Sequence, residues 1–342
     1  MKAAVMYDVG DLRLDDLPEP EPGHREVLIR VRASGLCGTD VHMYEGKNKE
    51  GTFPFIPGHE WAGEVMKLGP QVTSVQVGDR VMGDSFIPCG VCDVCKESIN
   101  SAYCPNHQAY GFSPEYSGGM CEYLKSPEKR LFKLADNMSF EEGALVENVS
   151  VPYTGIWRIA GGVAPHDRVA IFGAGPIGLM AMLIAKAAHA QTIVVETLEF
   201  RRKMVEEMGA EAVIDPTKED PVERIRHYTG GKGATLIVEC SGSDQAIAAT
   251  MDASALEGRI LLVGHSIGRK VAIEIGKMIW KGTKIVATCA APGYFPKVID
   301  YMARKPFDFT RAITHRFPLT SIMEAINVGL QYKKSMKIMI LP

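Results

Sequence analysis

Four cysteines lie close together in the chain, at Cys89, Cys92, Cys95 and Cys104. Their spacing, C-x2-C-x2-C-x8-C, allows four thiolates to reach one tetrahedral zinc ion without long-range folding. Four protein ligands leave no open coordination position, so the site is predicted to be structural and to take no part in chemistry. Four buried, reduced cysteines are the alternative, which the clustering disfavours. We expect a structural zinc lobe over about residues 86–108.

A second set of metal-binding residue types is dispersed along the chain. It comprises Cys37, His59, Glu60 and Glu147. A thiolate, an imidazole and a carboxylate together suit zinc, and three protein ligands leave a fourth position for water or an alcohol, as a catalytic site requires. Taken singly, each residue also fits an ordinary position: a small buried cysteine, a loop histidine or an exposed glutamate.

A glycine-rich segment has the form of a nucleotide-binding turn. Gly173, Gly175 and Gly178 form G-x-G-x-x-G after a predicted strand at 168–172 and open a helix predicted to begin near Pro176. The glycines permit a tight turn, close approach of the backbone to a pyrophosphate and close helix packing, and the helix N-terminus favours the anion. With Pro176 and Ile177, they are predicted to bind a dinucleotide.

An acidic residue follows at the expected distance. Glu196 ends the next predicted strand, about twenty residues on, where an acid accepts hydrogen bonds from ribose hydroxyls and repels a 2′-phosphate. This favours NAD over NADP. Arg201 and Arg202 lie close by, and an arginine there could pair with a 2′-phosphate, so the strictness of the preference stays open.

Two kinds of segment must position these residues. Up to about residue 150, short apolar runs are interrupted by Gly and Pro without long helical periodicity, which predicts a small antiparallel β domain. Beyond it, predicted helices, one of them at 246–255, alternate with strands at 168–172, 192–196, 211–215, 234–240, 258–264 and 284–289. Such alternation implies an α/β domain with a doubly wound parallel sheet. We predict one domain from 1–151 and 289–342, ending in a strand at 337–342, and a second from 152–288.

The bulk composition limits the classes of partner. A chain of 342 residues is long enough for two cores, and a net charge of −3 gives no strong field for nucleic acid or an anionic membrane. Around the four cysteines, the charges of Asp93, Lys96 and Glu97 roughly cancel, which disfavours a nucleic-acid zinc module.

The start, MKAAVMYDVG, lacks signal-peptide features and no apolar run is long enough to span a membrane, so a cytoplasmic protein with reduced thiols is expected. The single cysteines Cys121, Cys240 and Cys289 are predicted core residues.

Several of these segments together resemble a known family. GLCGTDVH at 35–42, GHEWAGEV at 58–65, VGDRV at 77–81, the four-cysteine loop and GAGPIGLM at 173–180 occur in the order seen in zinc-containing medium-chain dehydrogenases. The resemblance spans nearly the whole chain. It is greatest to the sorbitol, threonine and butanediol dehydrogenase branch, because Glu147 stands where ethanol-type enzymes carry a cysteine ligand.

The resemblance implies a fold, a reaction and a quaternary state. The fold is a GroES-like catalytic domain plus a Rossmann NAD-binding domain, with one catalytic and one structural zinc per chain. The reaction is hydride transfer from a secondary alcohol or polyol to NAD. A homodimer or homotetramer is implied as well. The alternatives are an NADPH-dependent zinc carbonyl reductase and a relative that binds the cofactor without catalysis.

The resemblance also implies roles for individual residues. Cys37 and His59 become zinc ligands, with Glu60 or Glu147 as the third. Asp40 orients the His59 imidazole, as carboxylates commonly do for metal-bound histidines. Thr39 hydrogen-bonds the substrate oxygen and His42 continues a proton relay. A helix cap and a surface histidine are the respective alternatives for these last two.

Two departures from the family pattern concern the zinc loop and the substrate. Cys95 and Cys104 enclose eight residues where relatives commonly have seven, a change that costs little in closure entropy. Near Ala290, polyol-oxidising relatives tend to carry an arginine that this sequence lacks. Aromatic candidates for the pocket wall, which fit a core equally well, are Phe86, Tyr110, Phe112 and Trp157.

Overall fold

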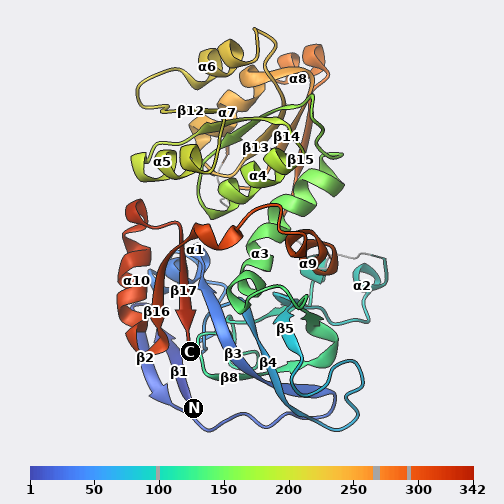
Figure 1. Ribbon diagram of the computed structural model, residues 1–342, viewed down its shortest axis with the longest axis vertical. Helices are drawn as coiled ribbons and strands as arrows, with labels where there is room; N and C mark the ends of the chain where they lie inside the picture. Colours follow the sequence, from blue (N-terminus) through green and yellow to red (C-terminus); the bar gives the residue numbers. More distant parts are fainter. Residues whose placement is uncertain (98–100, 265–269, 291–293) are drawn as a thin grey trace. The chain divides into compact units, whose positions relative to one another are not determined.

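The computed structural model describes residues 1–97, 101–264, 270–290 and 294–342, and the chain divides into two compact units (Figure 1). The first comprises Met1–Glu147 and Pro292–Pro342, and the second Asn148–Ala291. Within the described ranges, no helix has the length and apolar character needed to cross a membrane. The predicted combination of a β-rich domain with a parallel α/β domain is confirmed.

The first unit is built mainly of β-strands. Its strands are β1 (Lys2–Asp8), β2 (Asp11–Asp16), β3 (Glu26–Leu36), β4 (Glu60–Leu68), β5 (Arg80–Gly83), β6 (Phe86–Ile87), β7 (Gln108–Ala109), β8 (Tyr123–Pro127), β9 (Leu131–Lys133), β16 (Ile313–Pro318) and β17 (Lys337–Leu341). Seven form one sheet in the order β16-β17-β3-β4-β5-β9, with β8 also paired to β3. All pairs in that sheet are antiparallel except β16 with β17. The last strand of the chain thus lies beside β3 (EVLIRVRASGL), in which eight of the eleven residues are buried.

The register of three strands brings distant residues together. β3 pairs with β4 so that Gly35 lies opposite Glu60, and with β17 so that Leu36 lies opposite Ile338. The chain leaves β3 at Leu36 and enters helix α1 (Gly38–Tyr44), with Cys37 as its N-cap residue. The C-terminal end of β3 therefore meets the N-terminal ends of β4 and β17.

The remaining helices of this unit are α2 (Asp93–Glu97), α9 (Phe295–Ala303) and α10 (Ile322–Leu330), and α3 (Phe140–Thr154) runs across the boundary between the units. Helix α3, with 15 residues, does not follow from the sequence pattern, which shows no long helical periodicity up to about residue 150. Every residue from Glu142 to Ser150 is buried. A helix buried on all sides has no polar face, so its sequence lacks the helical periodicity that an amphipathic helix shows.

The second unit contains a six-stranded parallel sheet in the order β12-β11-β10-β13-β14-β15. Its elements are β10 (Arg168–Phe172), α4 (Pro176–Ala187), β11 (Gln191–Val195), α5 (Glu199–Glu207), β12 (Ala212–Ile214), α6 (Pro221–Tyr228), β13 (Ala234–Glu239), α7 (Asp244–Ala253), β14 (Ser254–Leu262), α8 (Ile275–Lys281) and β15 (Lys284–Ala287). This is the strand order of a dinucleotide-binding fold. Right-handed connections place α4 and α5 on one face of the sheet and α6, α7 and α8 on the other.

Most strands of this sheet lie where the sequence predicts them, but one strand and one helix differ. The predicted helix at 246–255 ends earlier, at Ala253, and β14 starts at Ser254 rather than at 258. Helix α8 was not foreseen at all, and none of its residues is buried. An amphipathic sequence pattern arises where one face of a helix is buried against a core. Because α8 has no buried residue, its sequence lacks such a pattern.

The single cysteines fall in different environments. Cys121 is buried, Cys240 is partly buried and Cys289 is exposed. The core prediction is therefore wrong for Cys289. It follows β15, which lies at the edge of its sheet, so the apolar run that precedes it does not lead into a core.

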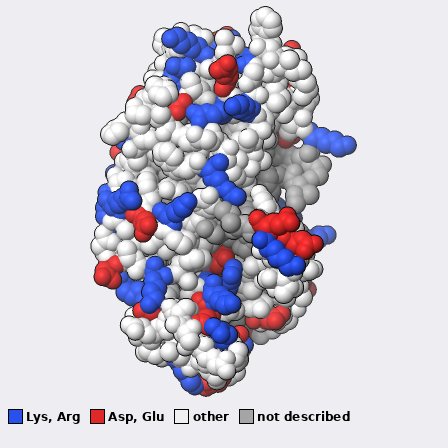
Figure 2. Space-filling view, turned by 90° about the vertical axis from the view of Figure 1, so that its right-hand side faces the viewer, with Lys and Arg blue, Asp and Glu red and all other residues white. Residues whose placement is uncertain are grey.

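Charged side chains of both signs are distributed over the surface. On the face shown in Figure 2, Lys and Arg are interspersed with Asp and Glu. The pattern agrees with the small net charge of the chain, −3.

Candidate metal and cofactor sites

Three metal-binding residues of different type converge where β3 ends and where β4 and β17 begin. Cys37 precedes α1, while His59 and Glu60 stand at the start of β4. One ligand atom from each of the three residues lies within 4.8 Å of those of the other two. His59 and Glu60 are buried, with 9% and 1% of their surface exposed. A thiolate, an imidazole and a carboxylate at such distances fit a zinc ion.

Asp40 lies on one side of the His59 ring. Its buried carboxylate accepts the backbone N–H groups of Cys37, at 2.8 Å, and Gly58, at 3.2 Å, and its Oδ1 is 3.9 Å from His59 Nδ1. His59 Nδ1 is buried and makes no hydrogen bond to any residue the structure describes. The side chain of Asp40 is thus held next to the imidazole by the turn that also carries Cys37, although the 3.9 Å separation is longer than a hydrogen bond.

Two glutamates lie near the His59 ring, each with a different partner. Both carboxylate oxygens of Glu60 accept hydrogen bonds from Lys337 Nζ, at 2.7 and 2.5 Å. Glu147, on α3, is 9% exposed, and its Oε1 accepts a hydrogen bond from Ser85 Oγ at 3.4 Å. Only the Glu60 carboxylate belongs to the group of ligand atoms within 4.8 Å. The sequence did not point to Lys337. The one unusual feature there is a charged residue at the start of the otherwise apolar strand β17.

The electrostatics of this region favour a bound cation. Burial opposes a charge on His59, but the Cys37 thiolate and the carboxylates of Asp40 and Glu147 outweigh it and raise the pKa of the imidazole well above its usual range. Burial raises the pKa of Asp40, and burial likewise raises that of Glu147. Burial also opposes the ammonium of Lys337, yet Glu60 and Cys37 hold its pKa above the ordinary value. The four acidic groups in this region outnumber His59 and Lys337, so a divalent cation would offset the excess negative charge.

The structure places the other predicted active-site residues as follows. Thr39 is partly buried, and its Oγ1 is 3.6 Å from Cys37 Sγ. The side chain of His42 is exposed. The Phe112 ring packs against His59, with 5.7 Å between ring centroids. Tyr110 is fully buried in the core, where its hydroxyl bonds to Ser126 Oγ, so it does not line an open pocket.

Of the other two aromatic candidates, Phe86 packs on His107 beside the four-cysteine loop, and Trp157, in the second unit, is 42% exposed.

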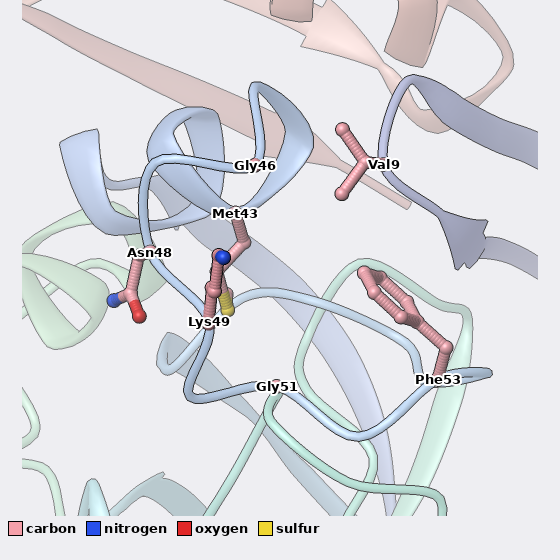
Figure 3. Close-up of a pocket in the computed structure, with 7 residues that line it drawn as sticks. All are labelled: Val9, Met43, Gly46, Asn48, Lys49, Gly51 and Phe53. Carbon is pink, nitrogen blue, oxygen red and sulfur yellow. The ribbon is translucent and has the colours of Figure 1, made fainter.

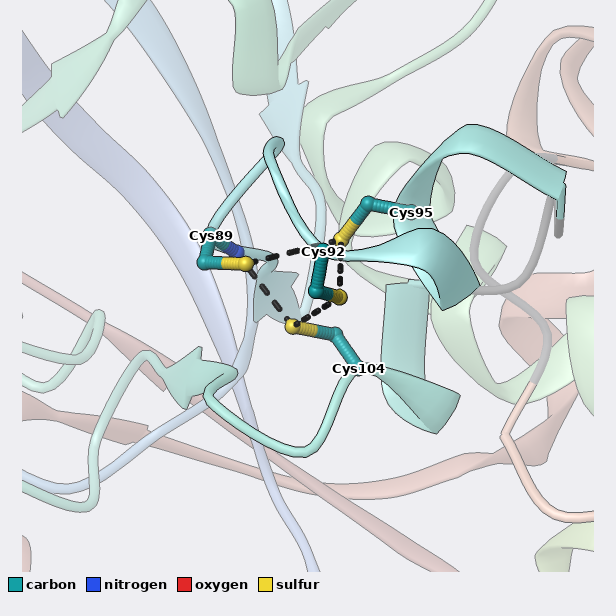
Figure 4. A group of neighbouring side chains, drawn as sticks. All are labelled: Cys89, Cys92, Cys95 and Cys104. Carbon is teal, nitrogen blue, oxygen red and sulfur yellow. Dashed lines mark hydrogen bonds between the residues drawn. The ribbon is translucent and has the colours of Figure 1, made fainter.

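The four clustered cysteines face one another, as Figure 4 shows. Cys92 Sγ lies 3.4 Å from Cys95 Sγ and 3.9 Å from Cys104 Sγ, and Cys89 Sγ lies 3.9 Å from Cys95 Sγ. Tetrahedral zinc with bonds of about 2.3 Å requires sulfur atoms about 3.8 Å apart, so these distances fit it. The backbone N–H groups of Val91 and Cys92 lower the pKa of Cys89 to about 6, whereas burial and the hydrogen bond with Cys92 raise the pKa of Cys95 to about 12. A bound metal ion would favour the thiolate at every one of these positions.

Two glycines of the turn in the second unit, Gly173 and Gly178, leave no room for a side chain. Gly173 has φ +86°, and a Cβ there would meet Ser241 at 2.8 Å. A Cβ on Gly178 would lie 1.9 Å from the Gly173 carbonyl oxygen, because α4 packs directly against the turn. Gly175 is the N-cap residue of α4 and Pro176 its first residue, followed by Ile177. The N-terminus of a 12-residue helix, preceded by bare backbone, fits a pyrophosphate.

Glu196 also holds this turn together, which the sequence did not reveal. Its Oε2 accepts the N–H of Ala174 at 2.7 Å, and its Oε1 accepts the N–H of Leu198 at 2.8 Å. Arg202 forms an ion pair with Asp215 at 2.9 Å and donates a hydrogen bond to the Glu196 carbonyl oxygen at 2.9 Å. Arg201 instead lies near the turn, with its Nη1 3.5 Å from where a Cβ of Gly175 would be.

A cavity of about 270 Å³ lies beside the loop that follows α1 (Figure 3). It is lined by Val9, Met43, Gly46, Asn48, Lys49, Gly51 and Phe53. None of these belongs to the predicted site residues, and we assign the cavity no part in the chemistry.

Comparison with known proteins agrees with this geometry. The family models described as "Alcohol dehydrogenase GroES-like domain" and "Zinc-binding dehydrogenase" match residues 23–136 and 176–304. Sorbitol dehydrogenase of Bacillus subtilis is 32% identical over 100% of this chain and 97% of its own length. The structure of 2R,3R-butanediol dehydrogenase from Bacillus subtilis is similar with a TM-score of 0.91 and 28% identity, covering 100% of this chain and 99% of that one.

A zinc-binding dehydrogenase from Sinorhizobium meliloti, solved bound to NADP, has a TM-score of 0.92 and 28% identity over 100% of this chain and 99% of that one. The identity to the curated relative and its full coverage establish the family. The chain therefore belongs to the zinc-binding alcohol dehydrogenase family, in the group that includes the sorbitol and butanediol dehydrogenases, and is a dehydrogenase that uses zinc and a nicotinamide cofactor.

Proposed function

We propose that this chain oxidises a secondary alcohol group of a polyol or diol and transfers the hydride to NAD. The observation that carries the proposal is the convergence of Cys37, His59 and Glu60 at the ends of β3 and β4. The relatives named sorbitol dehydrogenase and butanediol dehydrogenase support the substrate class. The lack of an arginine near Ala290 favours a diol or short polyol over sorbitol itself.

Cys37, His59 and Glu60 would hold the catalytic zinc. We propose Glu60 as the third ligand because its carboxylate lies in the group of close ligand atoms, whereas Glu147 lies outside that group. Asp40, held by two backbone N–H groups, would orient the His59 ring. Three protein ligands leave a position for the substrate oxygen.

When bound, zinc acts as a Lewis acid that lowers the pKa of the alcohol oxygen. Thr39, beside Cys37, would hydrogen-bond that oxygen and relay its proton, accepting it on Oγ1 as the hydroxyl proton of Thr39 moves on along the relay. His42 is exposed and would pass the proton on to solvent. Phe112, packed on His59, would cover one side of the site and exclude water.

The unit Asn148–Ala291 would be the NAD-binding domain, and the unit that contains Met1–Glu147 the catalytic domain. Gly173, Gly175 and the N-terminus of α4, including Ile177 and Gly178, would bind the pyrophosphate. Glu196 would accept hydrogen bonds from the adenosine ribose and disfavour a 2′-phosphate.

An NADPH-dependent carbonyl reductase is the second candidate. The NADP-bound structure of the Sinorhizobium meliloti relative and the position of Arg201 near the glycine turn favour it. If the cofactor is NAD, which has no 2′-phosphate, Arg201 would contact another part of the cofactor. Steady-state kinetics with both cofactors separates the two.

The four cysteines would hold a second, structural zinc, which makes two zinc ions per chain. The homo-oligomeric state, dimer or tetramer, and the cytoplasmic location stay predictions.

Formation of NADH from a panel of diols, polyols and threonine tests the proposal. We expect NAD-dependent oxidation of at least one secondary alcohol, with kcat/KM lower for NADP than for NAD. No turnover of any secondary alcohol by zinc-loaded protein, in either direction and with either cofactor, would contradict it.

A further inference from the structure

A lysine lies buried beside the proposed zinc ligands, at the start of β17. Lys337 is 2% exposed and Glu60 is 1% exposed. The Lys337 ammonium donates to both carboxylate oxygens of Glu60 and, at 3.4 Å, to the carbonyl oxygen of Leu36. An ammonium has three donors, so all of them are used and the position of the group is defined.

The space around the Glu60 carboxylate is shaped to hold it. Gly35 lies opposite Glu60 in the sheet, and a Cβ on Gly35 would lie 2.0 Å from Glu60 Oε2. The lysine itself comes from a strand 277 residues further along the chain. Three strands, β3, β4 and β17, therefore contribute to the placement of one carboxylate.

Fold stability alone does not account for this ion pair. Removing two charges from water costs about as much as their attraction returns, so a buried pair is a weak stabiliser compared with apolar side chains of the same volume. The neighbouring acids Cys37 and Glu147 also act on Lys337. The lysine thus stands among the groups that would surround the metal.

We propose that Lys337 is a positioning residue of the metal centre, which holds the Glu60 carboxylate beside Cys37 and His59 so that Glu60 serves as the third ligand. The proposal rests on the proposed function, in which these three residues bind zinc. Lys337 has two effects on the metal, of opposite sign. As a positive charge it repels a divalent cation, and as the hydrogen-bond partner of a ligand it orients that ligand. Loss of such a partner typically costs about 10–100-fold in metal affinity, so orientation is expected to dominate.

Cobalt(II) bound in place of the catalytic zinc tests this, with zinc retained in the four-cysteine site. The part of the visible spectrum lost in Cys37→Ser reports the metal held by Cys37. We expect Lys337→Met to alter these bands and to weaken cobalt binding about 10–100-fold in competition with a chelator. Lys337→Arg, which keeps the charge and the donors, should restore both. Glu60→Gln should alter the bands similarly, and adding Lys337→Met to it should change little more.

A matched control separates positioning from general destabilisation. Lys281, in the second unit, donates to three backbone carbonyl oxygens, those of Met251, Asp252 and Ser254. Lys281→Met is expected to lower the melting temperature without altering the cobalt bands.

Two results would overturn the proposal. Unchanged bands in Lys337→Met would show that the lysine does not act on the ligand set, and tighter cobalt binding would show that it acts only as a repelling charge. The failure of the proposed function is distinct, because the wild-type protein would then show no cobalt band that depends on Cys37.

Discussion

The two predicted zinc sites differ in how the fold assembles them. The four cysteines lie within one loop, from Cys89 to Cys104, and their sulfur atoms approach one another across short stretches of chain. The other site draws Cys37 from the end of β3, Glu60 from β4 and the supporting Lys337 from β17. The loop site should therefore depend on local geometry, and the dispersed site on correct pairing of the sheet. Only the dispersed site has fewer than four ligands, so only it should affect the reaction directly.

The largest expected effect is on turnover. Cys37→Ser removes a ligand of the dispersed site, and the several kcal/mol that a Lewis acid contributes to the transition state correspond to about 10³-fold in kcat. Binding of NAD, measured by fluorescence titration, should persist, because the glycine turn belongs to the other unit. Metal analysis should show one zinc per chain. Turnover near the wild-type level in such a variant would contradict the catalytic role of this site.

A smaller effect on turnover is expected at the loop site. Cys95→Ser should release the structural zinc and expose residues 89–104 to proteolysis, because α2 has no buried residue of its own to hold the lobe. Limited proteolysis and metal analysis report both changes. Retained cobalt bands from the Cys37 site would confirm that the two sites are independent. Loss of both metals together would show that the dispersed site depends on the loop site.

Gly35→Ala tests whether the sheet positions Glu60. The added methyl group would lie 2.0 Å from Glu60 Oε2, and such overpacking costs about 1–3 kcal/mol, so the melting temperature and the zinc content should both fall. Gly38→Ala is the matched control, since a Cβ there meets no atom within 4 Å. Equal behaviour of the two variants would argue against a shaped space for the carboxylate.

A pH-dependent contribution to stability, of smaller size, is expected from Glu128, a carboxylate of the first unit outside both proposed zinc sites. The N–H groups of Thr73 and Ser74, the Ser74 hydroxyl and the Arg25 guanidinium lower the pKa of Glu128 from 4.5 to about 2. A carboxyl with a lowered pKa stabilises the fold above its unfolded pKa, and this contribution is lost as the pH falls through the folded value.

Glu128→Gln should therefore lower the melting temperature at pH 7, and the difference from wild type should shrink as the pH falls from about 4.5 towards 2. Thermal melts at several pH values measure it. A difference that is independent of pH would show that the charge of Glu128 is not involved.

Local patterns were the part of the site that the sequence could predict. The spacing of the four cysteines and of Gly173, Gly175 and Gly178 reflects turns that a few consecutive residues define, and the structure has both arrangements. The same holds for the strands of the parallel sheet, whose apolar runs are bounded by helices. Helix α3 was missed because complete burial removes its periodicity, and α8 because it has no buried face.

The sequence by itself determined the two-domain α/β and β-rich architecture, the donor types available for two metal sites and the turn for a dinucleotide. Only the tertiary structure decided that Glu60, rather than Glu147, lies in the close group with Cys37 and His59, and that Lys337 holds it. It also decided that Glu196 bonds to the glycine turn. The reason is that strand register sets these distances, and register depends on hydrogen bonds between segments far apart in the chain, which no local pattern encodes.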